Sequence, residues 1–283
     1  MFSGHSQNWN LLKTDFEKKK VAPAYIFYGL PGIGKALVAK EWAKLIFGDS
    51  EKIDNNNHPD FHTIEPDGKQ IKIETLRNLK EELYKSPFEA SLHFVLINEA
   101  EKLTPQSSNS LLKVLEEPPS QTLFVLVTPN LFQIMPTIRS RSRSIYFSPP
   151  KLEDSLKILE NLGHTNPQTN KEILSLTDGS PGLAHILLGN DAQNILSLFD
   201  SIITTQKMPF KDIVKTTEKI VDESDNLGLC IDVFKKKLLY KHMEDKNPRW
   251  LNKIDRLSLA RQDWERNVNK NLLIENLFLD LTS

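Results

Sequence analysis

The sequence predicts an α/β domain with a parallel sheet, followed by helical domains. Two observations lead to this fold class. In the first half of the 283-residue chain, short apolar runs alternate with longer amphipathic segments. After Pro149 and Pro150 the strand-like runs vanish and only helical spacing continues. Nearly continuous apolar strands separated by helices are typical of a parallel sheet that is covered on both faces.

The expected strands are too short for helices and are rich in β-branched and aromatic residues. They span residues 24–28, 61–64, 93–98, 123–128 and 144–147. Between them, apolar residues recur at helical spacing, over 37–46, 73–84 and 111–115. Pro118 and Pro119 end the last of these helices.

The change of pattern divides the chain into three domains. We expect an α/β domain over residues 1–148, a small helical lid domain over 149–206 and a C-terminal all-helical domain over 207–283. No obvious linker marks the junction near residue 207.

Composition sets limits on function. The chain has 36 basic and 37 acidic side chains, a formal net charge of −1, which argues against a protein held on DNA or a membrane by its overall field. Its single cysteine, Cys230, excludes an intramolecular disulfide framework and fits a reducing cytosol. The N-terminus lacks a secretory signal, and no apolar run is long enough to span a bilayer. We therefore expect a cytoplasmic protein.

Glycine is scarce, at 11 of 283 residues, yet three glycines fall between positions 29 and 34. The segment follows a predicted strand, opens a predicted helix and fits the phosphate-binding loop G-x-x-x-x-G-K-[ST] except at its last position. In such a loop, backbone N–H groups surround phosphate oxygens and the lysine reaches the terminal phosphates. A glycine-rich turn without ligand is the alternative. The predicted binding residues are Gly29, Pro31, Gly32, Gly34 and Lys35.

The side chains that would handle Mg²⁺ are missing. Ala36 stands where a hydroxyl ligates the metal, and Asn98 ends a strand where an aspartate would hold it. Glu99 remains, but a base without a positioned metal stabilises little transition-state charge. We therefore expect no hydrolysis and no required cofactor, while binding of ATP or ADP without hydrolysis stays open.

A second candidate site lies in residues 136–143, where Arg139, Arg141 and Arg143 occupy alternate positions between two strands. A planar, permanently charged guanidinium suits phosphate recognition, including in trans at a neighbouring subunit. A solvated basic loop is the alternative interpretation.

The sequence carries three weaker signals. His58, Asp60 and His62 have metal-ligand chemistry, but one short segment rarely supplies a full ligand set, so we favour no metal. Cys230 lies among apolar residues and is expected to be buried. We interpret a basic helical segment as a solvated face, with phosphate contacts as the less favoured alternative. Its residues are Lys235, Lys236, Lys237 and Lys241.

Several stretches between residues 24 and about 187 are shared with a known family. The most specific are Leu111-Leu-Lys-Val-Leu-Glu-Glu-Pro-Pro119 and Thr137-Ile-Arg-Ser-Arg141, and others lie at 25–35, 58–62, 71–74, 123–128 and 179–183. In these stretches the chain resembles the delta-prime family of the bacterial DNA polymerase III clamp loader. The members of this family are AAA+ proteins.

The resemblance implies roles for single residues. Family members carry Ser-Arg-Cys, whose arginine reaches the ATP of the adjacent motor subunit; Arg141 takes this place, with Ser142 in place of the cysteine. At the position of the family's second-sensor arginine, this chain has Leu183. Many relatives also carry four zinc-binding cysteines, and residues 49–57 contain none, so no zinc is expected.

The function implied by the resemblance is that of a non-hydrolysing clamp-loader subunit within the DNA polymerase III holoenzyme. It would have no ATPase activity of its own, and would join the motor ATPase subunits and delta through a C-terminal oligomerisation (collar) domain. It would help to load the sliding clamp onto primer–template DNA and would supply Arg141 as an arginine finger. The alternatives are an ATP-hydrolysing motor subunit and a nucleotide-binding regulator. A sequence-specific DNA-binding protein lacks support, since neither a recognition helix nor a basic excess is present.

Overall fold

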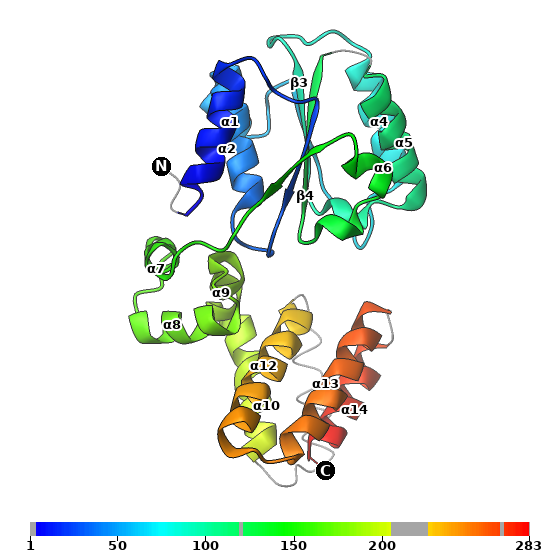
Figure 1. Ribbon diagram of the computed structural model, residues 1–283. Helices are drawn as coiled ribbons and strands as arrows, with labels where there is room; N and C mark the ends of the chain where they lie inside the picture. Colours follow the sequence, from blue (N-terminus) through cyan, green and yellow to red (C-terminus); the bar gives the residue numbers. More distant parts are fainter. Residues whose placement is uncertain (1–3, 119–120, 205–225, 267–268, 283) are drawn as a thin grey trace. The chain divides into compact units, whose positions relative to one another are not determined.

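The computed structural model describes residues 4–118, 121–204, 226–266 and 269–282. The chain divides into two compact units, Met1–Ser155 and Leu156–Ser283 (Figure 1). The predicted boundary between residues 206 and 207 lies outside the described residues, so the division into three domains stays a prediction.

The first unit is built on a parallel sheet. Its strands are β1 (Ala24–Tyr28), β2 (Phe61–Ile64), β3 (His93–Ile97), β4 (Thr122–Thr128) and β5 (Arg143–Tyr146). Among the described residues they form one five-stranded sheet in the order β2-β3-β4-β1-β5, with every pair parallel. All five strands agree with the sequence prediction to within one residue at each end, and the α/β fold class is confirmed.

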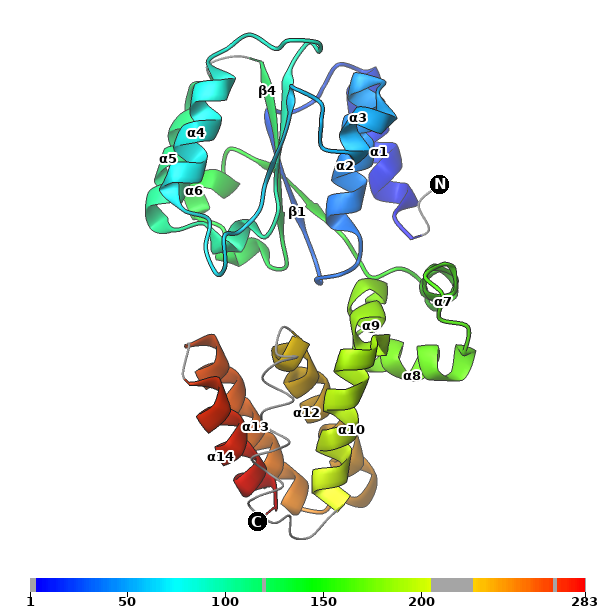
Figure 2. The same cartoon turned by 180° about the vertical axis from the view of Figure 1, so that it is seen from behind.

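Helices cover both faces of this sheet. α1 and α2 lie on one face, and α4 and α5 lie on the other, as two opposite views show (Figures 1 and 2). The helical segments are α1 (Ser6–Glu17), α2 (Lys35–Phe47), α3 (Ser50–Asp54), α4 (Ile73–Leu83), η1 (Ala100–Lys102), α5 (Pro105–Glu116), η2 (Leu131–Gln133) and α6 (Pro136–Arg139).

Alternate strand residues fill two separate cores. Tyr25 and Phe27 of β1 pack with Trp42 of α2, whereas Ile26 between them packs with Leu111 of α5 on the other face. This period of two follows from the pleat of a strand. Because both faces are covered, the central strands β3 and β4 are apolar except at their ends (His93, Thr122 and Thr128), and this explains the nearly continuous apolar runs of the sequence.

The described part of the second unit is helical. Its helices are α7 (Leu152–Asn161, which begins in the first unit), α8 (Pro167–Leu176), α9 (Pro181–Leu188), α10 (Asn190–Thr204), α12 (Leu227–Asp245), α13 (Arg249–Glu265) and α14 (Lys270–Thr282). Helices from α7 to α14 share one hydrophobic core, in which Phe199 stacks on Phe234 with ring centroids 4.9 Å apart. Across the residues that the structure describes, no helix is long and apolar enough to cross a membrane.

Two sequence predictions fall in α12. Cys230 is fully buried, as predicted, and burial raises the pKa of its thiol to about 12. The basic side chains have acidic or aromatic partners: Lys236 lies 2.5 Å from Asp178, and Lys237 lies 2.5 Å from Asp200. Lys235 lies 3.9 Å from Asp232, and Lys241 lies over the ring of Trp250. These pairs favour a solvated face over a phosphate patch.

Candidate functional site

The glycine-rich loop joins the carboxyl end of β1 to the start of α2, the edge of an open α/β sheet at which ligands bind. Gly29 has a φ of 146°, and a Cβ atom there would lie 2.1 Å from the carbonyl oxygen of Phe147. Gly34 has a φ of 97° and caps α2 in the left-handed conformation. Glycine is required at both positions, because a side chain would clash at the first and be strained at the second.

Lys35 is directed back onto its own loop. Its Nζ donates hydrogen bonds to the carbonyl oxygens of Gly29, at 2.6 Å, and Leu30, at 2.7 Å, and the residue is only 5% exposed. Burial lowers the pKa of Lys35 to about 8. The ammonium group that the sequence predicts to reach phosphate therefore has internal partners, which a nucleotide would have to replace.

The segment before α1 is fastened to the same loop. His5 is buried, and its Nε2 lies 2.6 Å from the carbonyl oxygen of Ile33, to which it donates as the protonated nitrogen. The His5 ring packs edge-on against Phe147, with centroids 5.1 Å apart. The hydrogen bond between His5 and Ile33 joins residues 28 positions apart, and no local pattern in the sequence indicates it.

The charge of Glu101 acts on Lys35 of the P-loop, and no local pattern of the sequence indicates this residue. The predicted base, Glu99, is 46% exposed and forms an ion pair of 2.6 Å with Lys102. Glu101 instead hydrogen-bonds Thr128 at the end of β4, and its charge acts on Lys35, opposing the effect of burial there. Burial raises the pKa of Glu101, and its Oε2 is buried without a hydrogen-bond partner.

The residues at the metal positions do not fit Mg²⁺. Ala36, in the first turn of α2, offers only a methyl group. Asn98 follows β3, and its backbone N–H donates to the carbonyl oxygen of Ile64 at 2.9 Å; its neutral amide supplies no charged oxygen. Mg²⁺ prefers carboxylate and phosphate oxygens. Of the two nearby glutamates, Glu99 pairs with Lys102, and burial raises the pKa of Glu101.

The three arginines of residues 136–143 do not form one patch. Arg139, the last residue of α6, stacks its guanidinium 5.1 Å above the ring of Phe132. Arg143 opens β5, and its Nη1 lies 2.6 Å from Asp15 Oδ2, a mostly buried carboxylate whose hydrogen bond raises the pKa of Arg143.

Arg141 lies between them, after the end of α6. Its Nη2 lies 2.7 Å from Oε1 of Glu116, the last residue of α5, and both side chains are 42% exposed. Its Nη1 donates to the carbonyl oxygen of Thr137 at 3.2 Å and to Ser140 Oγ at 3.4 Å. Arg141 is thus held at the surface, with part of its guanidinium facing solvent.

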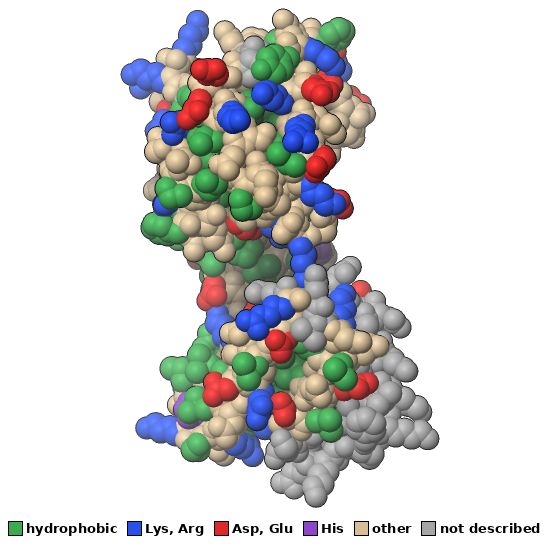
Figure 3. All heavy atoms as spheres, turned by 90° about the vertical axis from the view of Figure 1, so that its right-hand side faces the viewer, with side chains coloured by type: hydrophobic (Ala, Val, Ile, Leu, Met, Phe, Trp, Pro, Cys, Tyr) green, Lys and Arg blue, Asp and Glu red, His purple; other side chains and the backbone are tan. Residues whose placement is uncertain are grey.

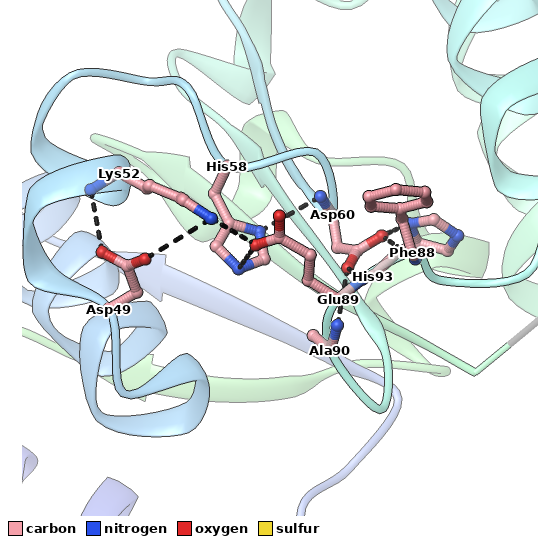
Figure 4. Close-up of polar contacts among 8 residues, drawn as sticks. All are labelled: Asp49, Lys52, His58, Asp60, Phe88, Glu89, Ala90 and His93. Carbon is pink, nitrogen blue, oxygen red and sulfur yellow. Dashed lines mark hydrogen bonds and ion pairs between the residues drawn. The ribbon is translucent and has the colours of Figure 1, made fainter.

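The His58, Asp60 and His62 side chains are engaged in contacts within the protein, and those of His58 and Asp60 are drawn in Figure 4. Asp60 accepts hydrogen bonds from the backbone N–H groups of residues 88, 89 and 90, at 2.7–2.8 Å. His58 stacks on Phe47 and accepts the N–H of Asp60 through Nδ1. His62 Nε2 lies 3.3 Å from Nδ1 of His93. No group of three or more His, Cys, Asp or Glu side chains suited to a metal occurs in the part of the chain that the structure describes.

The last candidate residue is Leu183, and the distribution of surface charge bears on possible partners. Leu183, at the predicted second-sensor position, is the third residue of α9, and its backbone N–H donates to Ser180 Oγ. On the face shown in Figure 3, basic and acidic side chains are interspersed in each unit. This agrees with the balanced charge of the sequence.

Comparison with known families assigns the first unit to a protein family. The family model for the DNA polymerase III delta subunit matches residues 4–151, just over half of the chain. The DNA polymerase III subunit delta' of Bacillus subtilis is 37% identical over 161 residues, which cover 52% of this chain and 49% of the relative. The subunit delta' of Escherichia coli is 33% identical over 136 residues, 47% of this chain and 41% of the relative. The chain spans about half the length of these relatives or less.

Solved structures extend the similarity of fold over nearly the whole chain. A DNA polymerase III gamma-subunit-related protein of Thermotoga maritima superposes with a TM-score of 0.61 at 19% identity, covering 96% of this chain and 98% of the other. A variant of RuvB from Thermotoga maritima gives a TM-score of 0.51 at 15% identity, covering 98% of this chain and 87% of the other. At these identities the similarity shows the fold alone, and it agrees with an α/β P-loop domain followed by helices.

Proposed function

Because the chain belongs to the DNA polymerase III delta-subunit family, with delta-prime subunits among its relatives, we propose that it is a non-hydrolysing subunit of a clamp loader. In this role it joins motor subunits of the gamma/tau kind and a delta subunit, and it helps to load the sliding clamp onto primed DNA. It supplies Arg141 in trans to the ATP of a neighbouring motor subunit.

The observation that carries this proposal is a contrast between two sites of the first unit. In the P-loop, Lys35 is bound to carbonyl oxygens of its own loop and the metal-binding side chains are replaced. At the surface, by comparison, Arg141 keeps a partly exposed guanidinium. A chain with an inactive loop and an available arginine contributes to a neighbour's reaction rather than to its own.

Substitution of the arginine tests this role. In a loader reconstituted with its motor subunits, Arg141→Ala is expected to lower DNA-stimulated ATPase activity by at least about tenfold, since an arginine finger supplies about 10³–10⁵-fold at a single site. The subunit composition of the complex should not change. Arg77→Ala, which removes an exposed arginine from α4, serves as the charge-matched control. Wild-type ATPase activity with Arg141→Ala would exclude the arginine finger.

A nucleotide-binding regulator is the second candidate function. The glycine conformations at Gly29, Gly32 and Gly34, all with positive φ, retain the backbone shape of a phosphate-binding loop. This favours some capacity for ATP or ADP, whereas the contacts of Lys35 and the charge of Glu101 oppose it. An ATP-hydrolysing motor subunit has less support, because Ala36 has no side-chain oxygen and Asn98 offers only a neutral amide oxygen in place of a carboxylate.

A further inference from the structure

The ion pair between Glu116 and Arg141 joins the two stretches of sequence that carry the family resemblance most specifically. Glu116 ends α5, and Arg141 follows α6, 25 positions later. The Oε1–Nη2 distance of 2.7 Å is that of a charge-assisted hydrogen bond. We propose that Glu116 is a positioning residue, which holds the guanidinium of Arg141 in the orientation needed to reach a phosphate on a neighbouring subunit.

An arginine that acts across an interface benefits from such support. An exposed arginine side chain loses rotamer entropy when it is fixed in one orientation. If the orientation is already set before the neighbour arrives, less of this cost falls on the catalytic step. Glu116 holds Nη2 of Arg141, and the Thr137 carbonyl and Ser140 hydroxyl hold Nη1, so both terminal nitrogens have partners.

These contacts leave donors for a ligand. A guanidinium has five N–H groups, and the contacts of Arg141 engage its Nη1 and Nη2 atoms through only part of them. At 42% exposure, the Arg141 side chain presents the rest of its edge to solvent. Glu116 therefore orients the guanidinium without enclosing it.

Both partners of the ion pair rest on well-packed elements. α5 begins at the N-cap Thr104, its Ser107 hydroxyl donates to the carbonyl oxygen of Ile71 at 2.7 Å, and Leu111 and Val114 are buried. α6 is anchored by Ile138, which is fully buried. The carbonyl oxygen of Ile138 accepts the backbone N–H of Arg141, at 3.1 Å, and the hydroxyl of Ser142, at 2.8 Å. The pair is therefore placed by the fold.

The opposite role, a latch that keeps Arg141 away from the neighbour, predicts a change of opposite sign. Removal of a latch would raise ATPase activity, whereas removal of a positioning residue lowers it. A partly exposed ion pair contributes a modest energy, so we expect an effect of about threefold for the positioning role.

The inference rests on the proposed arginine-finger function, and the experiment separates the two. Loaders are assembled with Glu116→Gln, Glu117→Gln, Arg141→Ala and the double variant of Glu116→Gln with Arg141→Ala. Their DNA-stimulated kcat and their KM for ATP are then measured. Glu117→Gln is the matched control, because it makes the same change of charge one residue further along.

We expect Glu116→Gln to lower kcat about threefold at nearly unchanged KM, Glu117→Gln to leave both unchanged, and the double variant to equal Arg141→Ala. Glu116→Asp, which retains the charge, should restore part of the lost kcat. If Arg141→Ala has no effect, the proposed function fails. If Arg141→Ala lowers kcat while Glu116→Gln does not, the positioning role is wrong. It is also wrong if Glu116→Gln raises kcat, or if Glu116→Gln lowers kcat further in the Arg141→Ala background.

Discussion

At the scale of single residues, the central feature is the buried Lys35 of the P-loop and the partly buried Glu101, whose charge acts on it. Lys35 donates to the Gly29 and Leu30 carbonyl oxygens, and Glu101 lies near enough for its charge to raise the pKa of Lys35 against the effect of burial. A nucleotide phosphate at this place would have to replace the carbonyl partners of the lysine. It would also meet the negative charge of Glu101, which in a low-dielectric site is costly.

This predicts that the wild-type chain binds ADP weakly or not at all. Calorimetric titration at millimolar ADP, with and without Mg²⁺, is expected to give no binding heat. Glu101→Gln should gain measurable binding, since it removes the repulsive charge and keeps the size of the side chain. The control is Glu99→Gln, at the exposed glutamate that pairs with Lys102. Binding of ADP by the wild type, strengthened by Mg²⁺, would instead support the nucleotide-binding regulator.

At the scale of elements, Asp60 ties the start of β2 to the loop that precedes β3. Its carboxylate is 1% exposed and accepts three backbone hydrogen bonds, from residues 88, 89 and 90 (Figure 4). Burial alone would raise the pKa of Asp60, but these N–H groups, together with the nearby His93, lower it below its usual value of 3.8. The carboxylate therefore has a structural role, at an edge of the sheet where the sequence also suggested metal chemistry.

Asp60→Asn is accordingly expected to lower the free energy of unfolding by about 2–3 kcal/mol, because the amide offers one neutral acceptor to the three N–H groups and no charge. Since the folded-state pKa lies below the unfolded one, the contribution of Asp60 is present above about pH 4 and is lost as the pH falls through the folded-state pKa. Urea denaturation from pH 7 to pH 3 measures both effects.

The control for this variant is Asp67→Asn, at an exposed carboxylate that pairs with Lys72. It should leave the unfolding midpoint unchanged at pH 7. A stability of Asp60→Asn equal to that of the wild type at pH 7 would contradict the structural role of the carboxylate.

Elements were predictable from the sequence where local pattern determines them. The strands were predicted because residues on both faces of the sheet are buried. Val95 lies in one core and Val125 in the other, and such residues together give long apolar runs. α1 was not predicted, because of its residues only Leu12 is buried and polar side chains dominate. The contacts of His5 with Ile33 and of Glu116 with Arg141 were also missed. These contacts join positions that are distant in the sequence, and local periodicity does not predict such a pairing.

At the scale of the molecule, the balanced charge and the interspersed surface charges fit a subunit that meets other proteins (Figure 3). The proposed function depends on this, because an arginine finger is of use only when a neighbour brings ATP to it. In the proposed function, the P-loop maintains the fold of the first unit, and the reaction takes place on the neighbour.

Assembly is therefore the most direct test of the central claim. The full chain is mixed with the gamma/tau-type motor subunit and the delta subunit of the same organism, and the mass of the purified complex is measured. We predict a stable complex of defined composition that contains this chain. A chain that stays monomeric in the presence of the motor subunit would contradict the account.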